Sequence, residues 1–226
     1  MCDHTFCYTS AVQKIRELVR SGSLGEIQYF DSVRINLGLI QADVDVFWDL
    51  GAHDLSILDY ILPDDVRPVS VAAQGSDPLG VGHPCVGYLS VGLSNGSIAH
   101  AHLNWLSPTK IRATIIGGSK KMVVWDDVQT EQRLSIYDTG IQLREDLDED
   151  ERRGLLVSYR TGDMVAPALA EVEALRRVVE EFADSIRTRR RPLTDGLAGL
   201  RVVQTLAGAQ QSLATGGSSV SLNLQH

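Results

Sequence analysis

The sequence predicts an α+β fold in which a largely antiparallel, open mixed sheet packs against helices. Two observations lead to this prediction. Segment 69–137 consists of short apolar runs separated by Gly, Asn, Ser and Pro, which is typical of successive strands. The segments on either side instead carry apolar residues at helical spacing. With 226 residues, 43% of them hydrophobic, the chain is most simply one domain over residues 1–226.

The N-terminal part is expected to contain a helix, a strand and a second helix. The first helix spans 10–21, with Ser10 as its N-cap and Gly22 after its end. Its apolar stripe consists of Val12, Ile15, Leu18 and Val19. A strand follows over 27–37, and the second helix covers about 49–62, where a proline ends it.

The central segment is expected to form the sheet. Strands are predicted over 69–73, 86–93, 98–105, 110–116, 121–125 and 133–137. Ser94-Asn-Gly-Ser97 is a strong hairpin signal between two of these strands. In a sheet of this kind one face packs on helices, so the other face is available to a partner.

The C-terminal part is expected to contain two helices, an amphipathic one over 167–189 and a last one over 198–215, where two glycines follow. The acidic run 145–151 before them predicts a solvated loop, because it lacks the spacing of an oxygen-ligand metal loop. The basic run 187–191 fits a solvated helix end, since cations there suit the helix dipole.

Charge and cysteine content restrict the classes of function. A formal net charge of -8 and a pI near 5.2 oppose nucleic-acid binding, which needs a clustered positive field. Cys2, Cys7 and Cys85 are odd in number and lack metal-ligand spacing, so neither a disulfide framework nor a metal site is expected. Without a signal peptide or a bilayer-spanning apolar run, a cytoplasmic protein with no membrane partner is expected.

Asp49 and His53 are the catalytic candidates, because they stand four residues apart at the start of a predicted helix and share one of its faces. A carboxylate beside an imidazole holds the ring in one tautomer and raises its basicity, which suits general acid/base work on a hydroxyl or carbonyl. The alternative is that Asp49 is only the N-cap of the helix and His53 a half-buried surface residue.

Five further residues are candidates for substrate binding. Arg34 and Asn36 lie two apart on one strand face and can bond sugar hydroxyls or a phosphate oxygen, with a cross-strand salt bridge as the alternative. Tyr8 and Trp48 can form an apolar wall for a sugar ring, although a Trp is more often core. Lys110 either reaches into the site or lies along a strand edge.

Several short motifs follow one another along nearly the whole chain. They are Asp3-His-Thr-Phe6, Gly22-Ser-Leu-Gly25-Glu-Ile27, Asp31-Ser-Val-Arg-Ile-Asn-Leu-Gly38, Trp48-Asp-Leu-Gly-Ala-His-Asp54, Trp105-Leu-Ser-Pro108, Ile116-Gly-Gly-Ser-Lys-Lys-Met122 and Ile186-Arg-Thr-Arg-Arg-Arg-Pro-Leu-Thr-Asp-Gly196. Together they resemble the C-terminal domain of the glucose-fructose oxidoreductase, inositol dehydrogenase and MocA family. Members that act on sugars and nucleotide sugars are the most similar.

The resemblance implies roles for the two catalytic candidates. In members that keep the motif, the residue matching His53 transfers a proton to or from the reacting sugar oxygen, and the residue matching Asp49 assists it. The family uses NAD or NADP, held by an N-terminal Rossmann unit with a Gly-x-Gly-x-x-Gly turn. That unit also supplies a catalytic lysine in a Glu-Lys-Pro motif. Neither motif occurs in these 226 residues.

The sequence therefore predicts the substrate domain of an NAD(P)-dependent sugar or nucleotide-sugar oxidoreductase, without a dinucleotide-binding domain. Residues 1–25 are expected to be a remnant of the Rossmann edge and its connecting helix. The chain alone is expected to bind no nicotinamide cofactor and to be inactive. Its expected partners are the sugar, further copies of itself through the sheet, and a separate chain that carries the Rossmann unit. The alternative is a non-catalytic sugar-binding or oligomerisation module.

Overall fold

The computed structural model describes residues 1–138, 140–143, 157–160 and 162–224. Its helices are η1 (Thr5–Tyr8), α1 (Ser10–Arg20), η2 (Phe47–Gly51), α2 (Ala52–Ile61), α3 (Ala174–Thr188) and α4 (Gly196–Ala214). The strands of the main sheet are β1 (Ile27–Leu37), β2 (Pro68–Ser76), β3 (Val86–Leu93), β4 (Ile98–Asn104), β5 (Leu106–Gly118), β6 (Met122–Asp126), β7 (Leu134–Tyr137), β10 (Met164–Val165) and β11 (Val220–Ser221). Strands β8 (Gly140–Leu143) and β9 (Val157–Arg160) pair separately.

Within the described ranges, the main sheet has the order β10-β7-β6-β5-β1-β4-β3-β2-β11. Its strand pairs are antiparallel except for β1 and β4, which run parallel. The predicted α+β class with an open, mixed and largely antiparallel sheet is confirmed. Strands β1 and β3 have the predicted bounds; burial alternates along the whole of β3, and along β1 between irregularities at its two ends.

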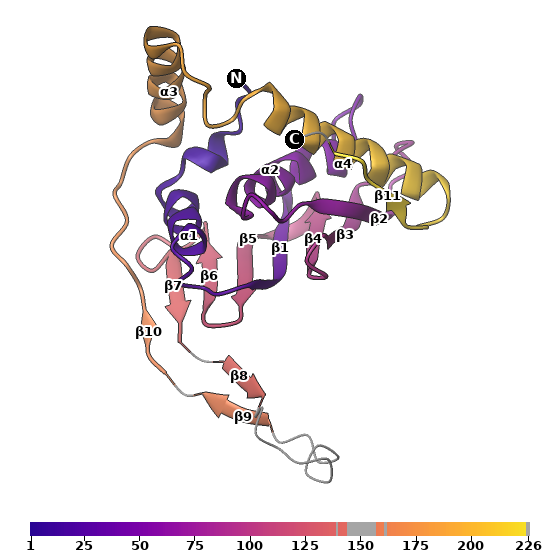
Figure 1. Cartoon of the computed structure of the whole chain (residues 1–226). Coiled ribbons are helices and arrows are strands. Elements are labelled where there is room, and N and C mark those ends of the chain that lie inside the picture. Colours follow the sequence, from indigo (N-terminus) through magenta and orange to yellow (C-terminus); the bar gives the residue numbers. More distant parts are fainter. Residues whose placement is uncertain (139, 144–156, 161, 225–226) are drawn as a thin grey trace.

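Helices α1, α2 and α4 lie on one face of the sheet (Figure 1), where α4 packs on β2 and β11 at one edge and α2 lies between α4 and α1. On β3, Leu89, Val91 and Leu93 point into the core between sheet and helices, whereas Tyr88 is exposed on the opposite face. Helix α3 stands apart from the sheet in Figure 1 and packs against η1. In the described parts of the chain, each helix is too short or too polar to cross a membrane.

Helix α1 is capped by a different residue from the one that was predicted. The Thr9 side chain, not that of Ser10, accepts a hydrogen bond from the backbone N–H of Val12. Thr9 has extended backbone, which suits an N-cap, whereas Ser10 is the first helical residue. The Ser10 hydroxyl instead donates to the Ala170 carbonyl, so it ties the start of α1 to a distant segment.

Helix α3 is shorter than the predicted helix over 167–189, because residues 166–173 form no regular secondary structure. The contact with Ser10 holds this segment against α1 rather than in a helix. The basic run 187–191 at the end of α3 is exposed, as predicted, and within it Arg190 also forms a bidentate ion pair with the buried Glu181 carboxylate at 2.7 and 2.6 Å. The acidic run 145–151 lies outside the described residues.

Candidate functional site

The start of the second helix sets the position of His53. The Asp45 carboxylate accepts hydrogen bonds from the backbone N–H groups of Phe47 and Trp48, at 2.9 and 3.0 Å. Helical structure therefore begins at Phe47, and Asp49 is not the N-cap that the alternative interpretation required. The first turn, Phe47–Gly51, is π-helical, a wide turn with i→i+5 bonding that frequently occurs at functional sites.

The π-helical turn separates the two predicted catalytic residues. Asp49 accepts a hydrogen bond of 2.8 Å from the indole N–H of Trp105. No hydrogen bond or ion pair joins Asp49 to His53 in the described structure. The i,i+4 contact expected from an ordinary α-helix does not form, because the wider turn changes which residues face each other. Asp49 acts on His53 only through its charge, which raises the pKa of the imidazole.

His53 lies at the edge of the Phe6 ring, with the two ring centroids 5.0 Å apart. Burial lowers the pKa of His53 below its usual value of 6.5, the positive charge of Arg34 lowers it further, and Asp54 acts in the opposite direction. Neither ring nitrogen has a hydrogen-bond partner among the described residues. At neutral pH this site therefore holds a neutral imidazole that is free to accept a proton from a ligand.

The lowered pKa of His53 predicts that the chain loses stability in mild acid. The unfolded chain binds this proton near pH 6.5 and the folded chain only at lower pH. The contribution is therefore complete above pH 6.5 and declines as the pH falls from there through the folded pKa. Urea denaturation across this range should show a shallower pH dependence for His53→Gln than for the parent chain. An identical slope in both proteins would contradict the prediction.

Arg34 is held by a buried ion pair with Asp54 of α2. Its Nε and Nη2 atoms donate to the two carboxylate oxygens, at 2.9 and 3.1 Å, and both side chains are at least 96% buried. The predicted alternative, a cross-strand salt bridge, is thus replaced by a strand-to-helix one. The Arg34 guanidinium also lies over Phe6, 4.4 Å from the ring centroid. This places Arg34 beside His53, whose ring touches the same phenyl group.

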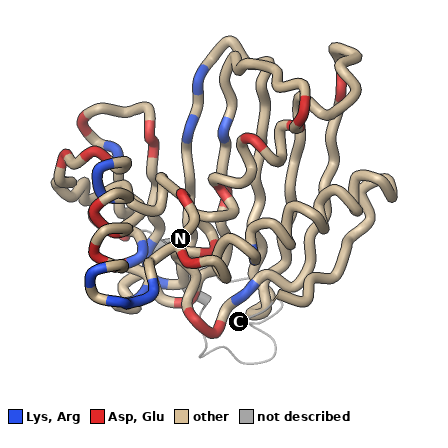
Figure 2. The backbone as a smooth tube through the Cα atoms, turned by 90° about the horizontal axis from the view of Figure 1, so that it is seen from above, with Lys and Arg blue, Asp and Glu red and all other residues tan. Residues whose placement is uncertain are grey.

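Arg112 completes a cluster of side chains around Phe6 that also contains Arg34 and His53, and the sequence interpretation missed it. It lies on β5 directly opposite Arg34 of β1, and its guanidinium carbon is 5.7 Å from the Phe6 centroid. Figure 2 shows basic positions side by side on neighbouring strands of the sheet. Arg112 reaches Asp127 at 3.6 Å. A strand was predicted over 110–116, but nothing in the sequence indicates that it pairs with 27–37.

The remaining predicted substrate-binding residues are dispersed. Asn36 lies next to the Trp105 ring, and its buried Oδ1 has no hydrogen-bond partner in the described structure. Tyr8 is buried and its hydroxyl bonds to Thr194. Trp48 faces the loop around Asp43 and His83. Lys110 is exposed on β5, where the register with β1 shifts. Of these four residues, only Asn36 lies near Trp105, the hydrogen-bond partner of Asp49.

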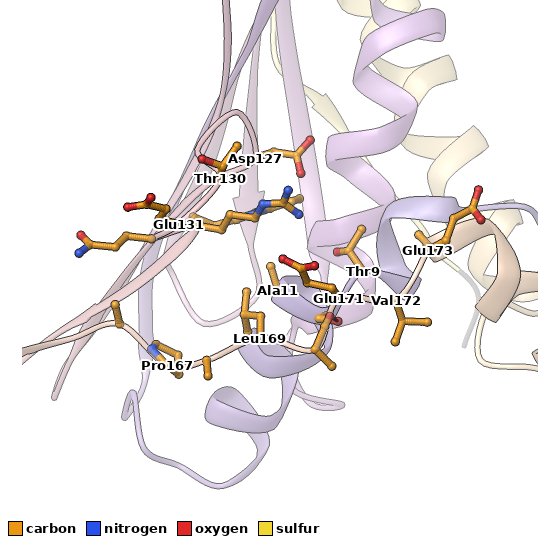
Figure 3. A pocket seen from close by; sticks show the side chains of 18 residues that line it. Thr9, Ala11, Asp127, Thr130, Glu131, Pro167, Leu169, Glu171, Val172 and Glu173 are labelled. Carbon is orange, nitrogen blue, oxygen red and sulfur yellow. Dashed lines mark hydrogen bonds between the residues drawn. The ribbon is translucent and has the colours of Figure 1, made fainter.

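A cavity of about 830 Å³ lies beside the cluster. Figure 3 shows that it is bounded by Thr9 and Ala11 at the start of α1, by Asp127 and Glu131 after β6, and by the segment 166–173. His53 does not line it. The cavity meets the cluster through Asp127, which pairs with Arg112, and Trp125, whose ring lies 6.3 Å from that of Phe6.

Among the described residues, the loop with Gly80 and Gly82, whose glycines come nearest to a Gly-x-Gly-x-x-Gly turn, does not fit the pyrophosphate of a dinucleotide. In this loop, the backbone N–H groups of Val81 and Gly82 donate to the Asp77 carboxylate at 3.0 and 2.7 Å. These hydrogen bonds lower the pKa of Asp77. A carboxylate thus occupies the donors that a pyrophosphate would need. Over the described residues there is also no group of three or more His, Cys, Asp or Glu side chains that could hold a metal ion.

Solved structures show the same fold. UDP-N-acetylglucosamine 3-dehydrogenase GnnA from Acidithiobacillus ferrooxidans superposes with a TM-score of 0.74 at 22% identity, over 94% of this chain and 61% of that one. A putative NADPH-dependent oxidoreductase from Desulfitobacterium hafniense gives 0.74 at 20%, over 98% and 64%. An inositol dehydrogenase homologue from Azotobacter vinelandii, complexed with NADH and myo-inositol, gives 0.71 at 15%, over 97% and 63%.

The chain thus spans less than two thirds of the length of each of these proteins. No curated protein sequence matches it significantly. Residues 12–124 match the model of the GFO/IDH/MocA C-terminal domain. This range includes β1 to β5 as well as η2 and α2. The resemblance found in the motifs is confirmed, and the chain belongs to the GFO/IDH/MocA family.

Proposed function

We propose that this chain is the substrate domain of an NAD(P)-dependent sugar or nucleotide-sugar oxidoreductase, in which His53 is the acid/base residue. The observation that carries the proposal is the His53 imidazole, which is kept neutral by burial and by Arg34, and whose ring nitrogens have no partner in the described structure. A neutral imidazole accepts the proton of a sugar hydroxyl as a carbonyl forms, and returns it in the reverse direction.

The other residues of the cluster support this proton transfer. Asp49 stabilises the imidazolium through its charge while its carboxylate is held by Trp105. Arg34 and Asn36 are our candidates for contacts to sugar oxygens, since each retains a buried polar atom without a partner. Tyr8, Trp48 and Lys110 are weaker candidates, because their surroundings do not connect them with His53.

The nicotinamide cofactor would supply the hydride acceptor, and a dinucleotide-binding unit outside these residues would have to hold it. Structural relatives that are named as a dehydrogenase and as a putative NADPH-dependent oxidoreductase support a nicotinamide cofactor for proteins of this fold. One of them is complexed with NADH and myo-inositol.

The proposal is tested by NMR titration of the histidine-labelled chain. UDP-N-acetylglucosamine, myo-inositol and glucose are added in turn, and the His53 ring signal is expected to shift with at least one of them. The signal of His100, on the opposite face of the sheet, should stay in place and serves as an internal control. If no sugar moves the His53 signal at millimolar concentration, the proposed function is wrong.

We also propose that the open face of the sheet joins two or more copies of the chain. Tyr88, Ile98 and Ile111 are exposed on the strands of this face, where they extend the predicted apolar surface. Sedimentation is expected to show a dimer or larger species rather than the 24.7 kDa monomer. Ile98→Lys should dissociate it, whereas Leu39→Lys, in an exposed loop, should not. A monomeric parent chain at micromolar concentration would refute this assignment.

A further inference from the structure

Two arginines in the candidate site, Arg34 and Arg112, each have a buried N–H donor without a partner. The Arg34 side chain is 4% exposed, and its Nη1 atom has no partner after Asp54 has taken Nε and Nη2. The Nε atom of Arg112 is also buried without a partner, because the contact with Asp127 uses Nη1. A guanidinium can only donate and stays charged, so each unpaired N–H is costly to bury.

The two groups converge on one place. Arg34 and Arg112 are directly opposite each other on neighbouring strands, and both strands turn these side chains toward the helical face. Both guanidinium carbons lie over the same Phe6 ring, 4.4 and 5.7 Å from its centroid. His53 contacts the edge of that ring. A ligand group bound between the arginines would therefore lie beside the proposed acid/base residue.

The three neighbouring carboxylates leave Nη1 of Arg34 and Nε of Arg112 without a partner. Asp54 pairs with Arg34 and Asp127 with Arg112, while Asp49 accepts a hydrogen bond from Trp105. A neutral hydroxyl offers the two guanidinium groups a single oxygen without charge. A carboxylate or phosphate presents two or three oxygens and accepts from both, through charge-assisted hydrogen bonds that are stronger than neutral ones.

We propose that Arg34 and Arg112, stacked on Phe6, bind an anionic oxygen group of the substrate, a carboxylate or a phosphate, next to His53. The inference rests on the proposed function and narrows its substrate class to acidic or phosphorylated sugars and their nucleotide derivatives.

The experiment is calorimetric titration of the full chain with glucuronate, glucose phosphate and glucose. At least one charged sugar is expected to bind about tenfold more tightly than glucose, the effect of hydrogen bonds to a charged group. Whether glucuronate or glucose phosphate binds better distinguishes a carboxylate from a phosphate. Arg112→Gln should remove the preference, since it deletes a cation that is partly exposed and whose loss leaves the Arg34–Asp54 pair intact. Arg176→Gln, an exposed arginine of α3 that pairs with Glu180, is the matched control and should keep it.

Equal affinity for glucose and both anions would overturn the inference while leaving a sugar site at His53 in place. No binding of either anion, or an anion preference that survives Arg112→Gln, would overturn it as well. The proposed function fails by a separate outcome, an unmoved His53 signal with every sugar.

Discussion

Replacing Asp54 by Ala is expected to lower the free energy of unfolding by about 3–5 kcal/mol, one of the largest effects of a single substitution in this chain. The carboxylate takes two of the Arg34 nitrogens at 2.9 and 3.1 Å, and both side chains are almost fully buried. Without it, a guanidinium stays inside the protein with no opposite charge. Urea denaturation of the variant and the parent chain at neutral pH measures the difference.

A double variant separates the loss of the ion pair from the loss of packing. Arg34→Met combined with Asp54→Leu removes both charges and keeps apolar volume on Phe6, so its stability is expected to be close to that of the parent chain. Asp64→Ala, whose carboxylate makes only an exposed contact with Arg20 at 3.4 Å, is the control and should change little. A loss below about 1 kcal/mol for Asp54→Ala would show that this pair is not the strong constraint inferred here.

The 226 residues alone are expected to show no nicotinamide-dependent oxidation of sugars or nucleotide sugars. Hydride transfer needs the nicotinamide held at near-attack distance, and the glycine loop that most resembles a phosphate site donates its N–H groups to Asp77. Spectrophotometric assays with NAD and NADP, together with calorimetry of cofactor binding, measure this. Cofactor-dependent turnover by the isolated chain, abolished in His53→Ala, would show an autonomous enzyme instead.

Fusion to the dinucleotide-binding unit of a family relative is expected to restore turnover. In that fusion, His53→Ala should lower kcat by about 10²- to 10⁴-fold, the usual contribution of a general acid/base. The matched histidine control is His100→Gln, on the opposite sheet face, which should leave kcat unchanged. An active fusion in which His53→Ala retains full turnover would remove His53 from the mechanism.

Some features of this fold could be predicted from local sequence. Strands β1 and β3 were predicted with their observed bounds, and the period-two burial that runs along all of β3 is a property of the strand itself. The hairpin between β3 and β4 follows from Asn95-Gly96, where Gly96 has a positive φ of 84°. The helix prediction over 167–173 was wrong, since local apolar spacing did not reveal that Ser10 binds the Ala170 carbonyl.

The sequence by itself determined the α+β class and the family, and it singled out His53 as a catalytic candidate. These depend on periodicity and on motifs that are contiguous in the chain. Only the tertiary structure decided the composition of the site. Asp49, in the π-helical turn, bonds to the distant Trp105 instead of His53. Pairing of β1 with β5 brings Arg112 beside Arg34, and folding of η1 places Phe6 between them and His53. These contacts join residues far apart in sequence, and strand pairing and burial, which create them, are properties of the whole chain.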